Sequence, residues 1–255
     1  MYRFDRRQHA PLLLLLSLLA LPTFAPAAEF CASTSANFLT ALQTAANSSE
    51  DDTIRIAGTT LTIPSQVTHT VQGALAIRGG YLPGCPEARN ANAMSSLQGP
   101  GNSGISLQVF RGDLTLERLQ FGNFTGINIS PVGFVDRSTR VGQILVQRCA
   151  WFANQHGLLI NTRRHDVRVE NSLFIGGLAN GGNILTGAGL SLVRSVRSLA
   201  DVDITSINNT AVGNSIGVVF GYSETSPTLP KMINTSLARP DTASASGNRE
   251  QCLRQ

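Results

Sequence analysis

The densest group of side chains that could do chemistry lies between residues 163 and 203. Its members are basic, acidic and imidazole groups from two neighbouring segments: Arg163, Arg164, His165, Asp166, Arg168, Glu170, Asp201 and Asp203. In a catalytic site, Asp203 and Glu170 would hold a cation or a sugar while Arg168 abstracts a proton. The alternative is a set of ordinary cross-strand ion pairs, each worth about 0.2–1 kcal/mol. We favour the ion pairs and keep Arg168, Glu170 and Asp203 as the catalytic candidates.

No other motif indicates a metal site or a cofactor. His69, His156 and His165 are isolated, and their neighbours lack the ligand spacing of a zinc site. No serine stands in a nucleophile-elbow sequence. The glycine-rich segment 176–182 lacks the lysine and the hydroxyl residue of a phosphate-binding loop. We therefore expect no metal ion and no cofactor.

Four segments that share one strand pattern must position these residues. They span 114–121, 144–151, 167–174 and 202–209. Positions one and three of each segment are β-branched or leucine, which is typical of a strand with one buried face. The chain then bends, and position six (Leu119, Cys149, Ser172 or Ile207) again points inward. Position eight is aromatic in three of the four segments.

A second short apolar run, beginning at glycine, follows each of these strands. The runs span 126–129, 157–160, 189–192 and 217–220. Successive first strands start 30, 23 and 35 residues apart, a spread that a β-helix tolerates because one loop per coil varies in length. One coil has no opposite face against which to bury its apolar residues, so coils must stack. The pattern predicts an all-β, right-handed parallel β-helix, a solenoid.

The stacking decides which residues become neighbours. Aligned strands would lie about 4.8 Å apart. One interior ladder would then contain Leu116, Val146, Val169 and Ile204. On this alignment Arg168 lies beside Asp203, with Glu170 two residues along on the same outer face. No outward column then gathers carboxylates on adjacent coils, whereas a Ca²⁺ site needs several and a glycosidase needs two.

The N-terminal part is expected to cap the stack and to start its first coils. Residues 37–46 place their apolar side chains on one helical stripe: Phe38, Leu39, Leu42, Ala45 and Ala46. Ser35 or Asn37 is the expected N-cap. This helix would cover the open end of the stack, which otherwise leaves strand edges unpaired. The segments 53–56, 74–77 and 105–109 are predicted to be strands.

We expect three divisions of the chain: a signal peptide at 1–28, a capped β-helix domain at 29–222 and a loosely ordered tail at 223–255. The leader has a basic start, an apolar run at 12–21 and the small residues Ala25-Pro26-Ala27 for cleavage. The apolar run is too short for a permanent anchor, so no membrane span is expected after its removal. The pattern predicts a secreted, periplasmic or cell-surface protein.

The charge balance says little about partners. Removal of the leader takes away three arginines and one aspartate, so the formal net charge falls from +4 to +2. Such a weak balance favours neither nucleic acid nor an anionic membrane as a partner. We expect a monomer.

All four cysteines remain after removal of the leader, which suggests disulfides in an oxidising compartment. Of the three connectivities, we favour one that contains a Cys31–Cys85 bond, because it would tie the N-terminal segment to an early coil. Cys149 falls at an inward position of the repeat. It is either a buried small side chain or the partner of Cys252, and the sequence favours neither.

Two strings carry a family resemblance. Asp51-Asp-Thr-Ile-Arg-Ile-Ala-Gly58, preceded by a short amphipathic helix, resembles the start of bacterial exported β-helix proteins of the pectate-lyase-like superfamily. Ile77-Arg-Gly-Gly-Tyr-Leu-Pro-Gly-Cys85 resembles a Gly-Gly-aromatic-x-x-x-Cys element of that group. The resemblance covers roughly residues 30–222 and implies the fold. It does not imply one activity, because the superfamily contains lyases, hydrolases, epimerases and adhesins.

These observations lead to two expectations about function. The first is an exported, non-catalytic β-helix with a structural or glycan-binding role, whose flank offers repeated polar positions and a few exposed aromatic side chains to a polysaccharide or cell-surface glycan. The alternative is a polysaccharide lyase or hydrolase that acts on an acidic glycan.

Overall fold

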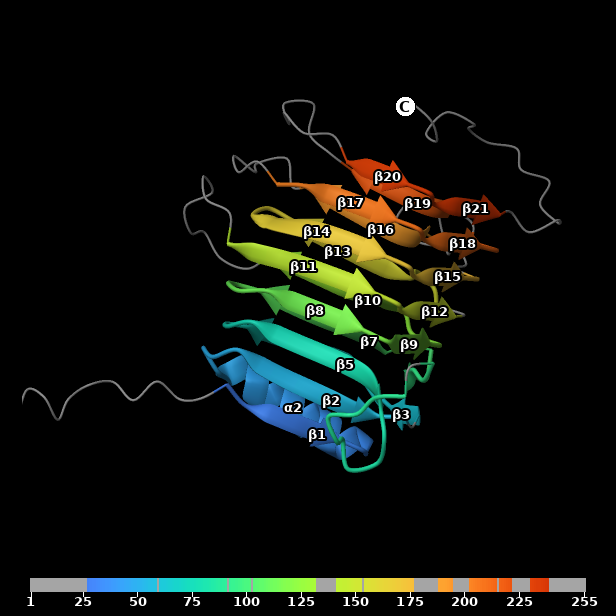
Figure 1. The fold of residues 1–255 in the computed structure, drawn as a ribbon. Helices are drawn as coiled ribbons and strands as arrows, with labels where there is room; N and C mark the ends of the chain where they lie inside the picture. Colours follow the sequence, from blue (N-terminus) through green and yellow to red (C-terminus); the bar gives the residue numbers. More distant parts are fainter. Residues whose placement is uncertain are drawn as a thin grey trace, which may run out of the picture.

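The computed structural model describes residues 27–58, 60–90, 92–101, 103–131, 141–152, 154–176, 188–194, 202–214, 216–221 and 230–238. These residues form three parallel sheets and one helix, α2 (Ser35–Asn47) (Figure 1). The signal peptide predicted at 1–28 lies outside the described residues except for Ala27 and Ala28. Within the described part, no helix is both long enough and apolar enough to cross a membrane.

The strands divide among the sheets as follows. Sheet A contains β1 (Glu29–Ala32), β2 (Asp52–Ala57), β5 (Leu75–Tyr81), β8 (Leu114–Glu117), β11 (Gly142–Gln147), β14 (His165–Glu170), β17 (Ile204–Ile207) and β20 (Lys231–Ile233). Sheet B contains β3 (Thr60–Thr62), β6 (Ser95–Gln98), β9 (Leu119–Gly122), β12 (Ala150–Phe152), β15 (Leu173–Ile175), β18 (Thr210–Val212) and β21 (Ser236–Ala238). Sheet C contains β4 (Val67–Val71), β7 (Gly104–Val109), β10 (Gly126–Pro131), β13 (Leu158–Thr162), β16 (Ala188–Arg194) and β19 (Ile216–Gly221).

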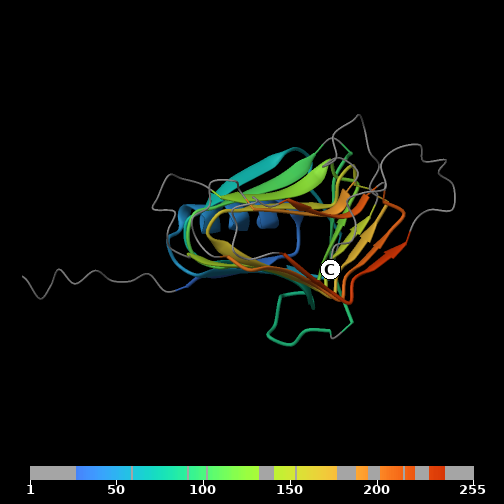
Figure 2. The ribbon, with the colours of Figure 1, turned by 90° about the horizontal axis from the view of Figure 1, so that it is seen from above.

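The chain visits sheets A, B and C in turn from β2 onward, and we call each such set of three strands a round. Each strand pairs in parallel with the strand of the next round in the same sheet, as β8 pairs with β11 and β11 with β14. Viewed from above, the three sheets enclose a common interior (Figure 2). The predicted all-β, parallel architecture is thereby confirmed, and the stacking of strands is consistent with a parallel β-helix.

The interior ladder predicted for sheet A is correct for three of its four members. Leu116, Val146 and Val169 are direct partners in β8, β11 and β14. The prediction is wrong for Ile204, which pairs with Val167, while Ser206 pairs with Val169. Ile204 is nevertheless buried. A shift of two residues keeps every side chain on the same face of a strand, so apolar alternation alone does not distinguish the two alignments.

The bend between sheets A and B explains the alignment that the chain adopts. The residue at this bend has a left-handed backbone in five successive rounds, with φ between 48° and 55°: Arg118, Arg148, Asn171, Asn208 and Asn234. Asparagine tolerates this conformation better than most residues. The alignment of Ile204 with Val167 brings Asn208 over Asn171, whose side chains form a hydrogen bond.

A buried polar ladder follows this bend on the interior side. The backbone N–H of Cys149 donates to Ser172 Oγ at 3.2 Å, and the N–H of Ser172 donates to Asn209 Oδ1 at 2.9 Å. Asn209 Nδ2 donates to the carbonyl of Val169 at 2.8 Å. Asn209, the eighth residue of the fourth segment, therefore occupies the inward place that the sixth residue takes in the other segments. The prediction that Ile207 points inward is wrong, because Ile207 lies in the outward column of Glu170.

The aromatic residues of the repeat form a buried stack in sheet B. The ring of Trp151 lies 5.2 Å from that of Phe121 and 4.6 Å from that of Phe174, measured between centroids. The three residues are direct partners in β9, β12 and β15. All three side chains are buried and contribute to the central core.

The N-terminal cap agrees with the prediction except at its first residue. α2 buries Phe38, Ala41, Leu42, Ala45 and Ala46 against the first round of strands. Its N-cap is Thr34 rather than Ser35 or Asn37, because the Thr34 hydroxyl accepts the N–H of Asn37 at 3.2 Å.

The predicted boundary at residue 222 is placed too early. Strands β20 and β21 pair with β17 and β18 and extend sheets A and B beyond it. The short segment 231–238 escaped sequence analysis because its two strands have only three residues each, although Asn234 repeats the left-handed bend. The rest of the predicted tail at 223–255, except for residue 230 and the bend between these strands, lies outside the described residues.

Candidate functional site

The segment between β5 and β6, described except for Ala91, lies at the outer side of sheet A near the N-terminal end of the stack (Figure 1). A disulfide joins its Cys85 to Cys31 of β1, with 5.6 Å between the Cα atoms. The predicted Cys31–Cys85 bond is therefore confirmed. Cys31 reaches this side because it is the partner of Arg55 in the outward column of sheet A.

Four arginines gather around this segment, and we call Arg55, Arg78, Arg89 and Arg118 the arginine cluster. Arg55 and Arg78 are direct partners in β2 and β5, and Arg78 is the partner of Glu117 in β8. They point outward because the residues beside them, such as Ile54 and Ile77, fill the core. Arg89 comes from the segment that the disulfide anchors, and Arg118 from the bend after β8.

Tyr81 contacts two of these arginines through its ring. The guanidinium carbons of Arg55 and Arg89 are 5.5 and 4.7 Å from the centroid of its ring. Tyr81 is buried, so these cation–π contacts hold both guanidinium groups against a rigid surface. Arg55 also pairs with Glu29 at 2.6 Å.

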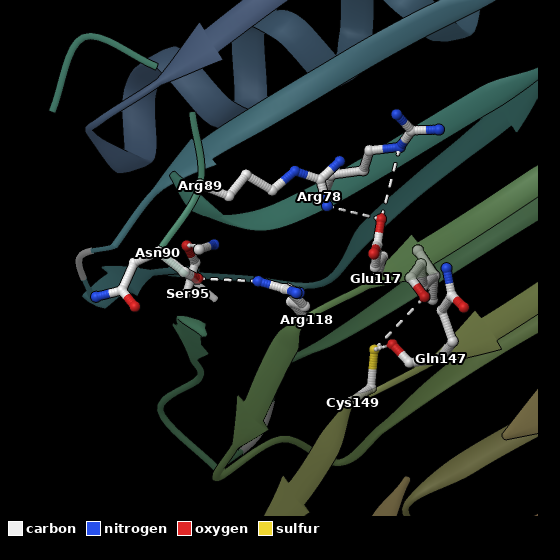
Figure 3. Close-up of polar contacts among 10 residues, drawn as sticks. Arg78, Arg89, Asn90, Ser95, Glu117, Arg118, Gln147 and Cys149 are labelled. Carbon is white, nitrogen blue, oxygen red and sulfur yellow. Dashed lines mark hydrogen bonds and ion pairs between the residues drawn. The ribbon is translucent and has the colours of Figure 1, made fainter. Parts of the chain in front are cut away.

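Glu117 is the carboxylate at the centre of the cluster (Figure 3). Its Oε2 accepts a hydrogen bond from Arg89 Nη1 at 2.8 Å and lies 3.8 Å from Arg78 Nε. The first is a short, charge-assisted hydrogen bond, whereas the second is an ion pair without one. Arg78 is therefore bound less closely to Glu117 than Arg89 is, and the side chain of Arg78 is 39% exposed.

Arg118 holds the anchored segment at a further point. Its Nη1 donates to the carbonyl of Asn90 at 2.9 Å, as Figure 3 shows. Arg118 does so from a left-handed backbone conformation that costs a bulky residue about 1 kcal/mol or more. The segment is thus fixed at Cys85, Arg89 and Asn90.

The cluster carries an excess of positive charge. Its four guanidinium groups face two carboxylates among the contacts that the structure describes, those of Glu29 and Glu117. The Nε atoms of Arg55, Arg78 and Arg118 are buried and have no hydrogen-bond acceptor. The positive potential of these groups is therefore only partly compensated by the protein.

The structure does not bring the three catalytic candidates together. Arg168 pairs with Glu170 on the same strand, with 2.7 Å between Nη2 and Oε2. Its cross-strand partner is Thr205, and the predicted pairing of Arg168 with Asp203 is wrong. This error follows from the two-residue shift described for Ile204. Asp201 lies outside the described residues.

The structure places Asp203 beside Asp166. The backbone N–H of Asp203 donates to Asp166 Oδ1 at 2.9 Å, just as the N–H of Gln143 donates to Asp113 Oδ1 at 2.8 Å two rounds earlier. The expectation that no outward column holds carboxylates on adjacent rounds is therefore wrong for Asp166 and Asp203. The residues that the structure describes contain no group of three or more His, Cys, Asp or Glu side chains that could hold a metal ion.

Cys149 is a buried free thiol, in agreement with the first of its two interpretations. Burial raises its pKa to about 12, so it stays protonated at neutral pH. Its Sγ donates to the carbonyl of Gln147 at 3.3 Å. Cys252 lies outside the described residues.

The three described histidines are kept neutral by their surroundings. Burial lowers the pKa of His69, His156 and His165 from the ordinary value of 6.5. For His165 the charge of Arg164 acts in the same direction, while the backbone of Gly112 and the nearby aspartates oppose it. Folding therefore favours the uncharged imidazole.

These pKa shifts predict an acid-sensitive fold. Below pH 6.5 the unfolded chain binds protons that the folded chain rejects, so the free energy of unfolding falls as the pH drops toward the folded pKa values. Urea unfolding at about pH 7.5 and about pH 5.5 measures this effect. His165→Gln should show a smaller fall than the native chain. Equal or higher stability of the native chain at the lower pH would contradict the prediction.

The arginine cluster was not predicted from the sequence, although one signal for it is present there. Arg118 and Arg148 occupy position five of the first two repeat segments, where a left-handed bend disfavours arginine. The other members are far apart in the sequence, and only the pairing of β2, β5 and β8 brings them side by side. No protein-family model matches the chain, and no curated protein sequence matches it.

Proposed function

We propose that the chain is an exported, non-catalytic, right-handed parallel β-helix that binds glycans on the outer face of sheet A. The order of the strands and the parallel pairing of successive rounds support the β-helix. The right-handed sense rests on the strong preference of parallel crossovers. The resemblance of residues 51–58 and 77–85 to the pectate-lyase-like superfamily supports the same assignment.

Export is supported by two independent features. A basic start and a short apolar run precede the first strand, as in a secretory leader. The Cys31–Cys85 disulfide is typical of proteins that fold in an oxidising compartment.

The main support for glycan binding is a column of outward-pointing side chains on sheet A. Successive rounds place one polar side chain each in this column: Arg55, Arg78, Glu117, Gln147 and Glu170. Neighbouring members lie about 4.8 Å apart along the stack. Such a regular row can contact successive units of a polymer, and weak contacts repeated along one chain add to the overall affinity.

Polar and charged contacts carry this binding in place of aromatic stacking. The large hydrophobic side chains that are exposed in the described part are Leu82, Met94, Met232, Ile233 and Leu237, none of them aromatic. Within the described part of the chain, the expectation of a few exposed aromatic side chains is therefore wrong. The aromatic residues of the repeat, Phe121, Trp151 and Phe174, fill the interior instead.

The alternative, a lyase or hydrolase for an acidic glycan, receives less support from the geometry. Arg168 would have to act as a proton-abstracting base, but its guanidinium is paired with Glu170. A guanidinium group that is hydrogen-bonded to a neighbouring carboxylate is not free to contact a substrate.

A glycan panel tests the proposal. The purified protein is expected to bind at least one polysaccharide in the panel with measurable affinity and without changing its chain length. The absorbance of unsaturated products is recorded on the same panel, with and without Ca²⁺. Product formation that Arg168→Ala abolishes would replace our proposal by the lyase, and binding to no glycan would refute it.

A further inference from the structure

The arginine cluster has more positive charge than the surrounding protein neutralises. The four arginines of the cluster and Arg148 of the adjacent round stand against Glu29, Glu117 and the exposed Glu87 of the 82–94 segment, which leaves a formal excess of two positive charges. Arg148 lies exposed at the next bend. Guanidinium charge in excess of the neighbouring carboxylates is unfavourable for the protein alone, because like charges repel.

Arg78 is the member that can accept a ligand. It is the most exposed arginine of the ion pairs in the cluster, and it makes no hydrogen bond to Glu117. Arg55 is its partner on the neighbouring strand, and Arg89 shares Glu117 with it. An anion over Arg78 would therefore be flanked by two further guanidinium groups.

These flanking groups are held in place before any ligand arrives. Arg55 and Arg89 both pack against the ring of buried Tyr81, and the disulfide and Arg118 fix the segment that carries Arg89. Side chains that are already ordered lose little conformational entropy on binding. This fixed arrangement is typical of a binding site rather than of a loose surface ion pair.

We propose that the arginine cluster is a phosphate-binding subsite, centred on Arg78, that takes a phosphate monoester of a glycan. A phosphate monoester carries a charge of about −1.5 to −2 at neutral pH, which matches the excess of two positive charges, whereas a single uronate carries only one negative charge. Guanidinium groups bind phosphate oxygens through paired hydrogen bonds. This inference rests on the proposed glycan-binding function and names the group that the glycan bears.

The test measures the affinity of the full-length purified protein for glucose 6-phosphate, for inorganic phosphate and for glucose, by calorimetry at low salt. Glucose 6-phosphate is expected to bind and glucose is not. Arg78→Gln should weaken binding about tenfold or more, as expected for loss of one charge-assisted hydrogen bond. Glu117→Gln should strengthen it, because it removes a competing carboxylate but keeps an oxygen acceptor for Arg89.

Arg168→Gln is the matched control, because it removes the same charge from the same face of sheet A, at a residue paired with Glu170. It should leave the affinity unchanged. An equal loss in Arg168→Gln, or none in Arg78→Gln, would overturn the subsite. Urea unfolding of each variant shows whether the fold is intact.

Two further comparisons separate the subsite from the glycan-binding function. Polysaccharide binding that persists unchanged in Arg78→Gln would refute the subsite and leave the glycan-binding function standing. Binding of inorganic phosphate as tightly as glucose 6-phosphate, with no polysaccharide bound, would support the anion site but refute its assignment to a glycan.

Discussion

Replacement of Trp151 by alanine is expected to lower the free energy of unfolding by about 3–5 kcal/mol, the range for large aromatic residues removed from a core. Trp151 is 1% exposed and packs between Phe121 and Phe174, so its loss leaves a cavity and breaks both ring contacts. Each such contact is worth about 0.5–1.5 kcal/mol beyond its burial. Urea unfolding followed by far-ultraviolet circular dichroism measures the loss, because Trp151 is the only tryptophan available for fluorescence.

Two variants of β12 provide the controls for this experiment. Trp151→Phe should cost much less than the alanine variant, because a phenylalanine keeps the stack and removes an indole N–H that has no acceptor. Phe152→Ala removes the neighbouring aromatic side chain, which points to the outer face and is partly exposed. If Phe152→Ala destabilised the chain as much as Trp151→Ala, the inward stack would not be the main source of stability in sheet B.

Loss of the Cys31–Cys85 disulfide is expected to lower the free energy of unfolding by about 4 kcal/mol, the value for a closed loop of this length in the chain-entropy model. The bond joins residues 54 apart and fixes β1, at the edge of sheet A, to the segment that carries Arg89. The double variant Cys31→Ser, Cys85→Ser and the native chain under reducing conditions should show the same loss in urea unfolding.

Cys149→Ser is the matched control for the disulfide. Serine already occupies the corresponding position in the next round, where the Ser172 hydroxyl donates to the carbonyl of Glu170 as Cys149 donates to that of Gln147. The stability of Cys149→Ser should therefore change far less than that of the double variant. A reducing agent should still destabilise Cys149→Ser, because this variant keeps the Cys31–Cys85 bond. Identical stability of the oxidised and reduced native chain would show that the bond contributes nothing.

The disulfide also bears on the proposed phosphate subsite. Reduction releases Cys85, one of the three points that fix the segment with Arg89 and Asn90. Arg89 would then lose part of its fixed position beside Glu117. An anion held partly by Arg89 should therefore bind less tightly to the reduced protein.

Much of the architecture follows from local patterns in the sequence. Alternation of apolar residues at 114–116, 144–146 and 167–169 was sufficient to predict strands of sheet A, and the runs at 126–129, 157–160, 189–192 and 217–220 became strands of sheet C. The helical stripe from Phe38 to Ala46 predicted the cap α2. These predictions succeed because strand and helix periodicities are properties of consecutive residues.

The alignment of the fourth segment could not be obtained in the same way. Both alignments of Ile204 bury the same face of the strand, and the choice depends on the left-handed bend at Asn208 and on the hydrogen bonds of Asn209 with the round below. Because of this error, Asp203 was predicted to lie beside Arg168, whereas Arg168 pairs with Thr205. The predicted catalytic group of Arg168, Glu170 and Asp203 therefore does not form. A mistake of two residues in the alignment of strands changes every predicted contact across the sheet.

The sequence alone was sufficient to predict most strands of sheets A and C, the capping helix α2 and the Cys31–Cys85 pair of this protein. The tertiary structure alone decided which outward side chains meet. Arg55, Arg78, Arg89 and Glu117 are neighbours only because successive rounds stack in one alignment and a disulfide holds the 82–94 segment against them. Contacts of this kind depend on the pairing of distant strands, and residue periodicity carries no information about that pairing once the apolar face is satisfied.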